Sequence, residues 1–376
     1  MLILMNIPLY KIFTDQEEID RVLEVIKRAS WWTEGKETKQ FEEMVAEYVG
    51  TKYAATFNSG TSALHALMLA FKIGIGDEVI VPSFSFIATA NAPLFVGAKP
   101  VFADIETDTY GLDIESVVEK ITKKTKAIMP VHYGGTACRD IIKLKKLAED
   151  NNILLFEDSA ESQGAKINGT SVGSIGDGSI FSLCGPKVMT TGEGGIVTTN
   201  SKKAYDRLRL VRSHGRELKQ YFGSSNTLDY LMLGYNWRVP TMVSALGIAQ
   251  MHKIDKMIHM RLHNSIILLD LLRNVKEITK LPELISGYRQ VYQLFTIEVD
   301  ETIRDDLIKF LTEKGIATKV YFSPIHLTKF HRGFGHKVGE LPITENKSKQ
   351  VITLPMYPSL TLEEMNYIKE AINDFF

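Results

Sequence analysis

One lysine stands in a setting that suits covalent chemistry. Lys187 lies in the stretch FSLCGPKVMTTGEGG, between two β-rich runs, with Gly185 and Pro186 before it and three glycines after it. Glycines let a backbone and a bulky ligand approach each other closely. A lysine on a rigid turn that gives up its proton can attack a carbonyl carbon and form a Schiff base. Most lysines are exposed surface charges, and for Lys187 taken alone that interpretation prevails.

Two further segments carry groups that a phosphorylated, nitrogen-containing ligand needs. The stretch FNSGTSAL is a β-rich run that ends at Gly60 and Thr61 and continues as a helix, whose N-terminal N–H groups and positive dipole end suit a phosphate. The stretch ILLFEDSAESQGA places Asp158 at the carboxyl end of a predicted strand, where open α/β sheets bind ligands. Each segment also reads as a plain helix N-cap. The order of turn, aspartate and lysine along the chain favours the functional interpretation.

The elements that position these residues form a repeating pattern. Short β-rich runs alternate with helical patterns from about Tyr53 to Val197, which is typical of a mostly parallel sheet covered by helices. The predicted strands are YAATF, EVIVP, KPVFAD, KAIMPVH, ILLFED, GSIFSLC and GGIVTT. The fold class is therefore α/β, with a mostly parallel seven-stranded sheet flanked by helices.

The rest of the chain predicts a second, smaller domain. A long helical stretch from Thr241 to about Leu272 connects the two domains. Beyond it, YQLFTIEV, RDDLIKFLTEKG, ATKVYF and a final helix from Leu362 predict a small α/β unit. We expect a large domain over residues 1–250, including the N-terminal segment, and a small C-terminal domain over residues 251–376.

Composition narrows the classes of partner. The 44 Lys and Arg residues nearly balance the 45 Asp and Glu residues, which argues against nucleic acid or an anionic membrane as a partner. The two cysteines, Cys138 and Cys184, have no nearby cysteine partner, so we expect no metal site and a reducing, cytoplasmic location. The N-terminal apolar run lacks the basic leader and cleavage site of a signal peptide. No stretch approaches the roughly 18 uncharged apolar residues of a membrane span.

Together the motifs resemble the DegT/DnrJ/EryC1/StrS family of sugar aminotransferases, a branch of the fold-type I enzymes that use pyridoxal 5'-phosphate (PLP). The resemblance covers nearly the whole chain. It runs through FEEMVAEYVGTKYAATFNSGTSAL, GDEVIVPSFSFIATANAPLFVGAKPVFADI, EDSAESQGA, FSLCGPKVMTTGEGG, GYNWRVPTMVSALGIAQM and LPMYPSLT.

The resemblance implies a role for each residue around the cofactor ring. Lys187 forms the Schiff base with PLP and then moves the proton, and Asp158 pairs with the pyridine nitrogen. Phe86 stacks on the ring, and Glu161 lies near the phenolic oxygen. Many relatives carry Gln or His in place of Glu161, and a carboxylate there favours the protonated imine. Glu193 is a candidate for orienting the lysine loop.

The resemblance also implies a phosphate site shared between two subunits. Gly60, Thr61 and Ser182 resemble the phosphate cradle within one chain. Asn236, in GYNWR, resembles a residue that the neighbouring subunit supplies to the phosphate. The implied assembly is a homodimer with shared active sites.

Candidates for contact with the substrate have a weaker basis. His326 matches a histidine near the substrate in relatives, although a lone histidine in a loop is more often an ordinary polar residue. Arg238 pairs either with a substrate phosphate or with a carboxylate across the dimer. Trp31 and Trp32 stack on a sugar or base, or pack in the core or at an interface. His132 is expected to be structural.

The implied reaction has two halves. An amino donor, by family analogy glutamate, converts PLP to pyridoxamine 5'-phosphate, and the amine then passes to the ketone of a nucleotide-linked sugar. The product is an amino-sugar nucleotide, as used in polysaccharide biosynthesis.

Three different functions compete with this reaction. A sugar dehydratase of the same family ranks below the aminotransferase, because in those relatives histidine replaces the lysine that is present here as Lys187. A non-catalytic regulatory homologue would not need the pair of Asp158 and Lys187, which is intact. A doubly wound α/β protein that binds another nucleotide would show no yellow absorbance from a lysine–PLP linkage.

Overall fold

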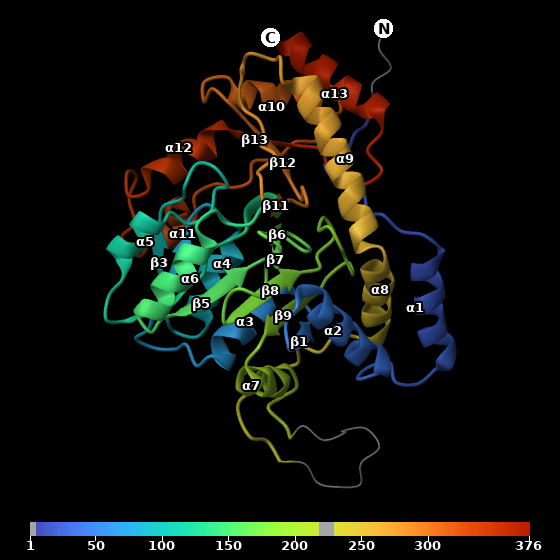
Figure 1. The fold of residues 1–376 in the computed structure, drawn as a ribbon, viewed down its shortest axis with the longest axis vertical. Helices are drawn as coiled ribbons and strands as arrows, with labels where there is room; N and C mark the ends of the chain where they lie inside the picture. The colour runs from blue at the N-terminus through green and yellow to red at the C-terminus, as the bar shows by residue number, and fades with distance from the viewer. Residues whose placement is uncertain (1–4, 218–228) are drawn as a thin grey trace.

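A twisted sheet with helices on both faces forms the centre of the computed structural model, which describes residues 5–217 and 229–376 (Figure 1). The strand order is β1-β9-β8-β5-β4-β2-β3. The strands are β1 (Tyr53–Phe57), β2 (Glu78–Pro82), β3 (Lys99–Ala103), β4 (Thr125–Ile128), β5 (Leu154–Asp158), β8 (Gly178–Ser182) and β9 (Gly195–Thr199). Strand β9 is antiparallel to both of its neighbours, and the other neighbouring pairs are parallel. The predicted sheet and its seven strands are confirmed.

Side chains on the two faces of this sheet belong to two separate hydrophobic cores. In β2, Ile80 points into one core while Val79 and Val81 point into the other, as the alternation of side chains along a strand requires. The first face is covered by α2 (Lys36–Val49), α5 (Ile114–Lys120), α6 (Ile141–Asp150), α8 (Thr241–His252) and the beginning of α9 (Ile254–Leu272). The second face is covered by α3 (Gly60–Ala70), α4 (Ile87–Phe95) and α7 (Lys202–Arg212).

The C-terminal part has its own core around an antiparallel sheet. The sheet order is β10-β12-β13, with β10 (Ile278–Lys280), β12 (Phe295–Val299) and β13 (Val351–Leu354). Helices α9 (Ile254–Leu272), α10 (Arg304–Glu313) and α13 (Leu362–Phe375) contribute to the same core. The expected strand and helix in YQLFTIEV and RDDLIKFLTEKG are confirmed, as is the final helix. ATKVYF contributes only an isolated bridge between Lys319 and Thr353.

Two features of the predicted division differ in the structure. The expected helical stretch over 241–272 consists of two helices that meet at Lys253, which has non-helical backbone angles and whose amine lies 2.8 Å from Glu18 and 2.6 Å from Asp15. The N-terminal segment does not pack only with the large domain. Ile7 is buried in the C-terminal core and its N–H donates to the Gly315 carbonyl at 2.8 Å.

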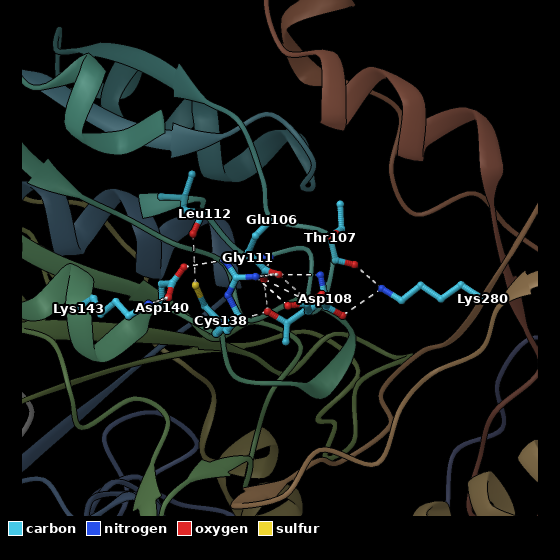
Figure 2. Close-up of polar contacts among 11 residues, drawn as sticks. Glu106, Thr107, Asp108, Gly111, Leu112, Cys138, Asp140, Lys143 and Lys280 are labelled. Atoms are coloured by element: carbon cyan, nitrogen blue, oxygen red, sulfur yellow. Dashed lines mark hydrogen bonds and ion pairs between the residues drawn. The ribbon is translucent and has the colours of Figure 1, made fainter. Parts of the chain in front are cut away.

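The two parts also meet along the loop that follows β3. Glu106 accepts hydrogen bonds from the backbone N–H groups of Asp108, Thr109 and Gly111 and so fixes the shape of this loop. Lys280, at the end of β10, donates to the Thr107 and Asp108 carbonyls (Figure 2). Elements from both parts of the chain are therefore joined close to the carboxyl edge of the central sheet.

No helix among the described residues is long and apolar enough to cross a membrane. Within the same ranges, no group of three or more His, Cys, Asp or Glu side chains is arranged to hold a metal ion.

Candidate active site

Strand pairing brings the predicted phosphate residues together. Strands β1 and β8 both end where β9 begins, so Gly195 lies opposite Phe57 on one side and opposite Ser182 on the other. A Cβ atom on Gly195 would lie 2.2 Å from the carbonyl oxygen of Ser59, so only glycine allows this close approach. Gly60 in turn packs against Ser182, since a Cβ atom on it would lie 3.1 Å from the serine Cβ.

The N-terminus of α3 opens at this point. Ser59 caps the helix, because its side chain accepts a hydrogen bond from the Ser62 N–H. Thr61 is exposed, while Ser182 is 8% exposed at the end of β8. A helix N-terminus beside hydroxyl groups provides N–H donors and a favourable dipole for an anion. The three residues expected to form a phosphate cradle, Gly60, Thr61 and Ser182, thus lie side by side.

Asp158 is a buried carboxylate at the carboxyl end of β5. Its Oδ2 accepts a hydrogen bond from Thr89 Oγ1 at 2.7 Å, and its Oδ1 accepts one from the Ala160 N–H at 3.2 Å. Burial raises the pKa of Asp158 above its ordinary value, and the hydrogen bond from Thr89 opposes the rise. A cationic ring nitrogen placed here would stabilise the ionised carboxylate.

Lys187 lies in the loop between β8 and β9, with its side chain 15% exposed. Its Nζ lies 3.5 Å from Glu161 Oε1, and the other oxygen of Glu161 accepts the Gly134 N–H at 3.0 Å. The positive charge of Lys187 also opposes the rise in the pKa of Asp158. An amine, its carboxylate partner and a buried aspartate therefore converge on one edge of the sheet.

Phe86 presents an aromatic face beside these groups. It occupies the N-cap position of α4 and is 61% exposed, although it is a large apolar side chain. The same segment carries Thr89, which contacts Asp158, so Phe86 and Asp158 belong to one local arrangement. An exposed ring at this place suits stacking on a flat ligand.

Several polar residues of the site were not predicted from the sequence. Ser85 and Thr89, one helical turn apart, form a chain of hydroxyl groups that ends on Asp158. Tyr321 lies near Glu161 and Cys184, and burial together with the nearby acidic groups raises its pKa to about 12. The spacing of Ser85 and Thr89 in PSFSFIATA is a signal that the sequence contained, whereas the approach of Tyr321 depends on the packing of the C-terminal part.

The chemistry of this set of donors fits PLP. The α3 N-terminus suits its phosphate, Asp158 suits its ring nitrogen, Phe86 suits its flat face and Lys187 suits its aldehyde. The carboxylate of Asp158 uses two hydrogen bonds within the described part of the chain, which leaves room for a further donor.

The structure places His326 in the interior, and its expected contact with the substrate stays a prediction. The residue is fully buried, and both of its ring nitrogens have partners within the chain. Nδ1 lies 2.7 Å from Ser83 Oγ and Nε2 lies 3.2 Å from Glu345 Oε1. Burial lowers the pKa of His326, which favours its neutral form. His326 ties the 325–327 turn to the end of β2.

The other substrate candidates lie on exposed or intermediate surface. Arg238 donates to Ser213 Oγ at 3.1 Å and lines a cavity of 490 Å³. Trp31 and Trp32 are 43% and 50% exposed, so neither is a core residue. Of the predicted roles for the two tryptophans, packing at an interface and contact with a ligand remain.

Asn236 is exposed, and its segment contacts the turn at residues 58–61 of its own chain, here called the phosphate turn. The carbonyl of the next residue, Trp237, accepts the Asn58 N–H at 3.1 Å. Nearby, Leu231 and Leu233 are 58% and 78% exposed.

The structural interpretation of His132 agrees with its contacts. The Cys138 N–H donates to His132 Nδ1 at 2.9 Å, so the proton lies on Nε2, which donates to Glu157 at 3.0 Å. Glu193 is exposed and contacts Cys184, three residues before Lys187. Its effect on the lysine loop stays a prediction.

The chain is similar to known aminotransferases over nearly its whole length. Residues 13–373 match the model of the DegT/DnrJ/EryC1/StrS aminotransferase family. The chain is 34% identical to a GDP-perosamine synthase of Escherichia coli O157:H7, over 98% of each protein. The structure of PseC from Helicobacter pylori, an aminotransferase involved in the biosynthesis of pseudoaminic acid, is 29% identical and covers 99% of both chains with a TM-score of 0.93. The sugar aminotransferase Spr1654 of Streptococcus pneumoniae, described as putative and solved in a PLP form, is 27% identical, with 98% of both chains covered and a TM-score of 0.92.

The fold is that of the fold-type I, PLP-dependent transferases. The chain belongs to the DegT/DnrJ/EryC1/StrS aminotransferase family. The expected family, fold class and enzyme class are therefore confirmed.

Proposed function

We propose that this protein transfers an amino group from glutamate to the ketone of a nucleotide-linked sugar and so forms an amino-sugar nucleotide. The observation that carries the proposal is the pairing of the Lys187 amine with Glu161 at 3.5 Å, on the same sheet edge as the buried Asp158. Two relatives are named for nucleotide sugars. One is a GDP-perosamine synthase, 34% identical to this chain, and the other is a UDP-4-amino-4-deoxy-L-arabinose–oxoglutarate aminotransferase, 32% identical.

Each residue then has a specific task. Bound PLP would supply an electron sink for the carbon that loses a proton. Lys187 would hold the cofactor covalently and carry the proton, and Glu161 would accept a hydrogen bond from the lysine nitrogen. Asp158 would keep the ring nitrogen protonated, and Phe86 would cover the ring face.

The phosphate is bound by Gly60, Thr61 and Ser182 in this proposal. Asn236 adds a contact from the neighbouring subunit of a homodimer. Its exposure and the exposed leucines beside it support the presence of a partner. The same segment also lies against the phosphate turn of its own chain, so the two arrangements need an experiment to separate them.

The shared site is tested by mixing two inactive proteins, Lys187→Ala and Asn236→Asp. If Asn236 acts across the interface, subunit exchange creates sites with both intact residues and restores activity. Verified exchange without recovery means that Asn236 acts within its own subunit.

The reaction is tested with purified, PLP-loaded protein, glutamate and a panel of nucleotide keto-sugars. We expect 2-oxoglutarate and a product whose mass matches an amino sugar. A product that has lost water instead would identify a dehydratase. Lys187→Ala should lose the visible absorbance of the lysine–PLP linkage and about 10⁴-fold in rate, because both the covalent link and the proton carrier are removed. Full activity of this variant would contradict the proposal.

A cytoplasmic location belongs to the same proposal. Both cysteines are free thiols, Cys138 buried and Cys184 partly exposed, which suits a reducing compartment.

A further inference from the structure

The peptide group that precedes Lys187 is hydrogen-bonded on both sides. Its N–H, on Lys187, donates to the Cys184 carbonyl at 3.0 Å. Its carbonyl, on Pro186, accepts a hydrogen bond from Gln293 Nε2 at 2.6 Å. Because the peptide unit is planar, these two bonds fix the orientation of this peptide and with it the position of the Lys187 Cα atom, from which the side chain starts.

A second glutamine closes the loop around this peptide. Gln163 Nε2 donates to the Ser182 carbonyl, and its Oε1 accepts the Met189 N–H at 2.9 Å. One buried side chain thus spans the two ends of the segment that contains Lys187. Gln163 belongs to the large domain, whereas Gln293 lies just before β12, where the chain enters the C-terminal sheet.

The segment that carries Gln293 also reaches the carboxylate partner of Lys187. The Leu294 N–H donates to the Gly134 carbonyl at 3.1 Å, and the Gly134 N–H donates to Glu161. The segment can lie this close because the neighbouring Gly135 has no side chain. A Cβ atom on Gly135 would lie 2.8 Å from the backbone nitrogen of Gln293. Gln293 and Leu294 are adjacent in the chain. Together they therefore contact the peptide group before Lys187 and the turn that binds Glu161.

The hydrogen bonding of Gln293 indicates that its Nε2 donor, and not its Oε1 acceptor, is the group that contacts the lysine loop. The Pro186 carbonyl can only accept, so the Nε2 atom must face it. The Oε1 atom is buried and has no hydrogen-bond partner among the described residues, an arrangement that costs free energy. An apolar side chain would avoid this cost but would leave the Pro186 carbonyl without its donor.

We propose that Gln293 is a positioning residue that sets the Lys187 amine relative to Glu161, through the Pro186 carbonyl. The inference rests on the proposed function, because it assigns Lys187 the covalent role. Removing the donor should let the lysine loop shift, which changes both the protonation of the lysine–PLP nitrogen and the geometry of proton transfer.

The test compares Gln293→Met with Gln290→Met in the PLP-loaded protein. Gln290 is a matched control, since it lies on the same segment, is 8% exposed against 5% for Gln293, and contacts Thr136 and Ile285 instead of the lysine loop. The first measurement is the pH midpoint of the visible absorbance band without substrate. The second is the rate of the half-reaction with L-glutamate over a range of glutamate concentrations.

We expect Gln293→Met to shift the pH midpoint and to lower the limiting rate about tenfold, with a smaller change in the glutamate concentration for half-saturation. Gln290→Met should leave the midpoint and the rate close to those of the wild type. No shift in Gln293→Met, or equal shifts in both variants, would overturn the inference while leaving the proposed function intact. A wild-type protein that shows no visible band with PLP would instead refute the proposed function.

A folding defect is covered by a second variant. If Gln293→Met does not fold, Gln293→Leu replaces it in the same measurements. If neither variant folds while Gln290→Met does, Gln293 serves stability and the inference is overturned.

Discussion

Two neighbouring carboxylates on β5, one on each face of the sheet, have opposite surroundings. Glu157 is fully buried and accepts four hydrogen bonds, from the N–H groups of Gly173, Ile175 and Gly176 and from His132. A carboxylate has about four acceptor positions, so within the described chain Glu157 is saturated. It fixes the 173–176 loop and carries no capacity for a ligand.

Asp158, the next residue, is almost as buried at 3% exposed but accepts only two hydrogen bonds from the described residues, from Thr89 and Ala160. Its raised pKa reflects this incomplete compensation for burial. Burial alone therefore does not separate a structural carboxylate from a functional one. The number of unfilled acceptor positions does separate the two carboxylates, because a ligand can donate hydrogen bonds only to positions that no protein group already occupies.

Asp158→Asn should have the largest effect on turnover. Asparagine keeps the shape but loses the charge that holds the ring nitrogen protonated, and removing such an electrostatic group lowers kcat by about 10²- to 10³-fold. Steady-state kinetics measures this change, and PLP binding should persist through the phosphate. Wild-type turnover in this variant would remove the distinction between the two carboxylates.

Glu157→Gln should mainly lower stability, by about 3 kcal/mol. The amide cannot accept on its nitrogen, so buried N–H groups of the 173–176 loop lose their acceptor. Chemical denaturation of the apo-protein measures the free energy of unfolding. A variant as stable as the wild type would show that the four hydrogen bonds of Glu157 do not have the importance that their number suggests.

Thr89→Val should lower kcat about tenfold, since it removes the hydroxyl that donates to Asp158 at 2.7 Å. Thr198→Val is the matched control on the other side, because Thr198 Oγ1 donates to the Gly173 carbonyl at 2.8 Å, beside Glu157. The control should lose about 1 kcal/mol of stability with kcat unchanged. Equal effects of the two variants on kcat would argue against separate roles for the two faces.

The smallest effect concerns the pH dependence of apo-protein stability. Burial raises the pKa of Asp158 above its ordinary value of 3.8, so the folded state holds this proton more tightly than the unfolded state does. The contribution of Asp158 to stability is then complete below about pH 3.8 and is lost as pH rises through the higher folded pKa. Asp158→Asn has no such loss, so its stability relative to the wild type should increase from pH 4 to pH 7. Denaturation curves at both pH values test the sign.

The sequence predicted the central sheet well because each strand carries its own signal. Runs such as EVIVP and GSIFS are apolar, short and bounded by turn residues, so they form strands whatever lies beside them. The break in the 241–272 helical stretch was missed; at this point Lys253 contacts Asp15 and Glu18, which are far away in the chain and leave no local signal. The N-terminal contact of Ile7 with the C-terminal core was missed for the same reason.

The same division holds for the site. The sequence by itself determined the residues at or just after the ends of strands, namely Gly60, Asp158 and Ser182, and the loop after β8 that carries Lys187, because parallel strands end at one edge of a sheet. Only the tertiary structure decided which polar groups are already satisfied. His326, expected at the substrate, is bonded to Ser83 and Glu345, while Gln163 and Gln293 turned out to hold the loop that carries Lys187. Hydrogen bonds between residues far apart in the chain depend on how whole elements pack, and no local pattern of residues records that.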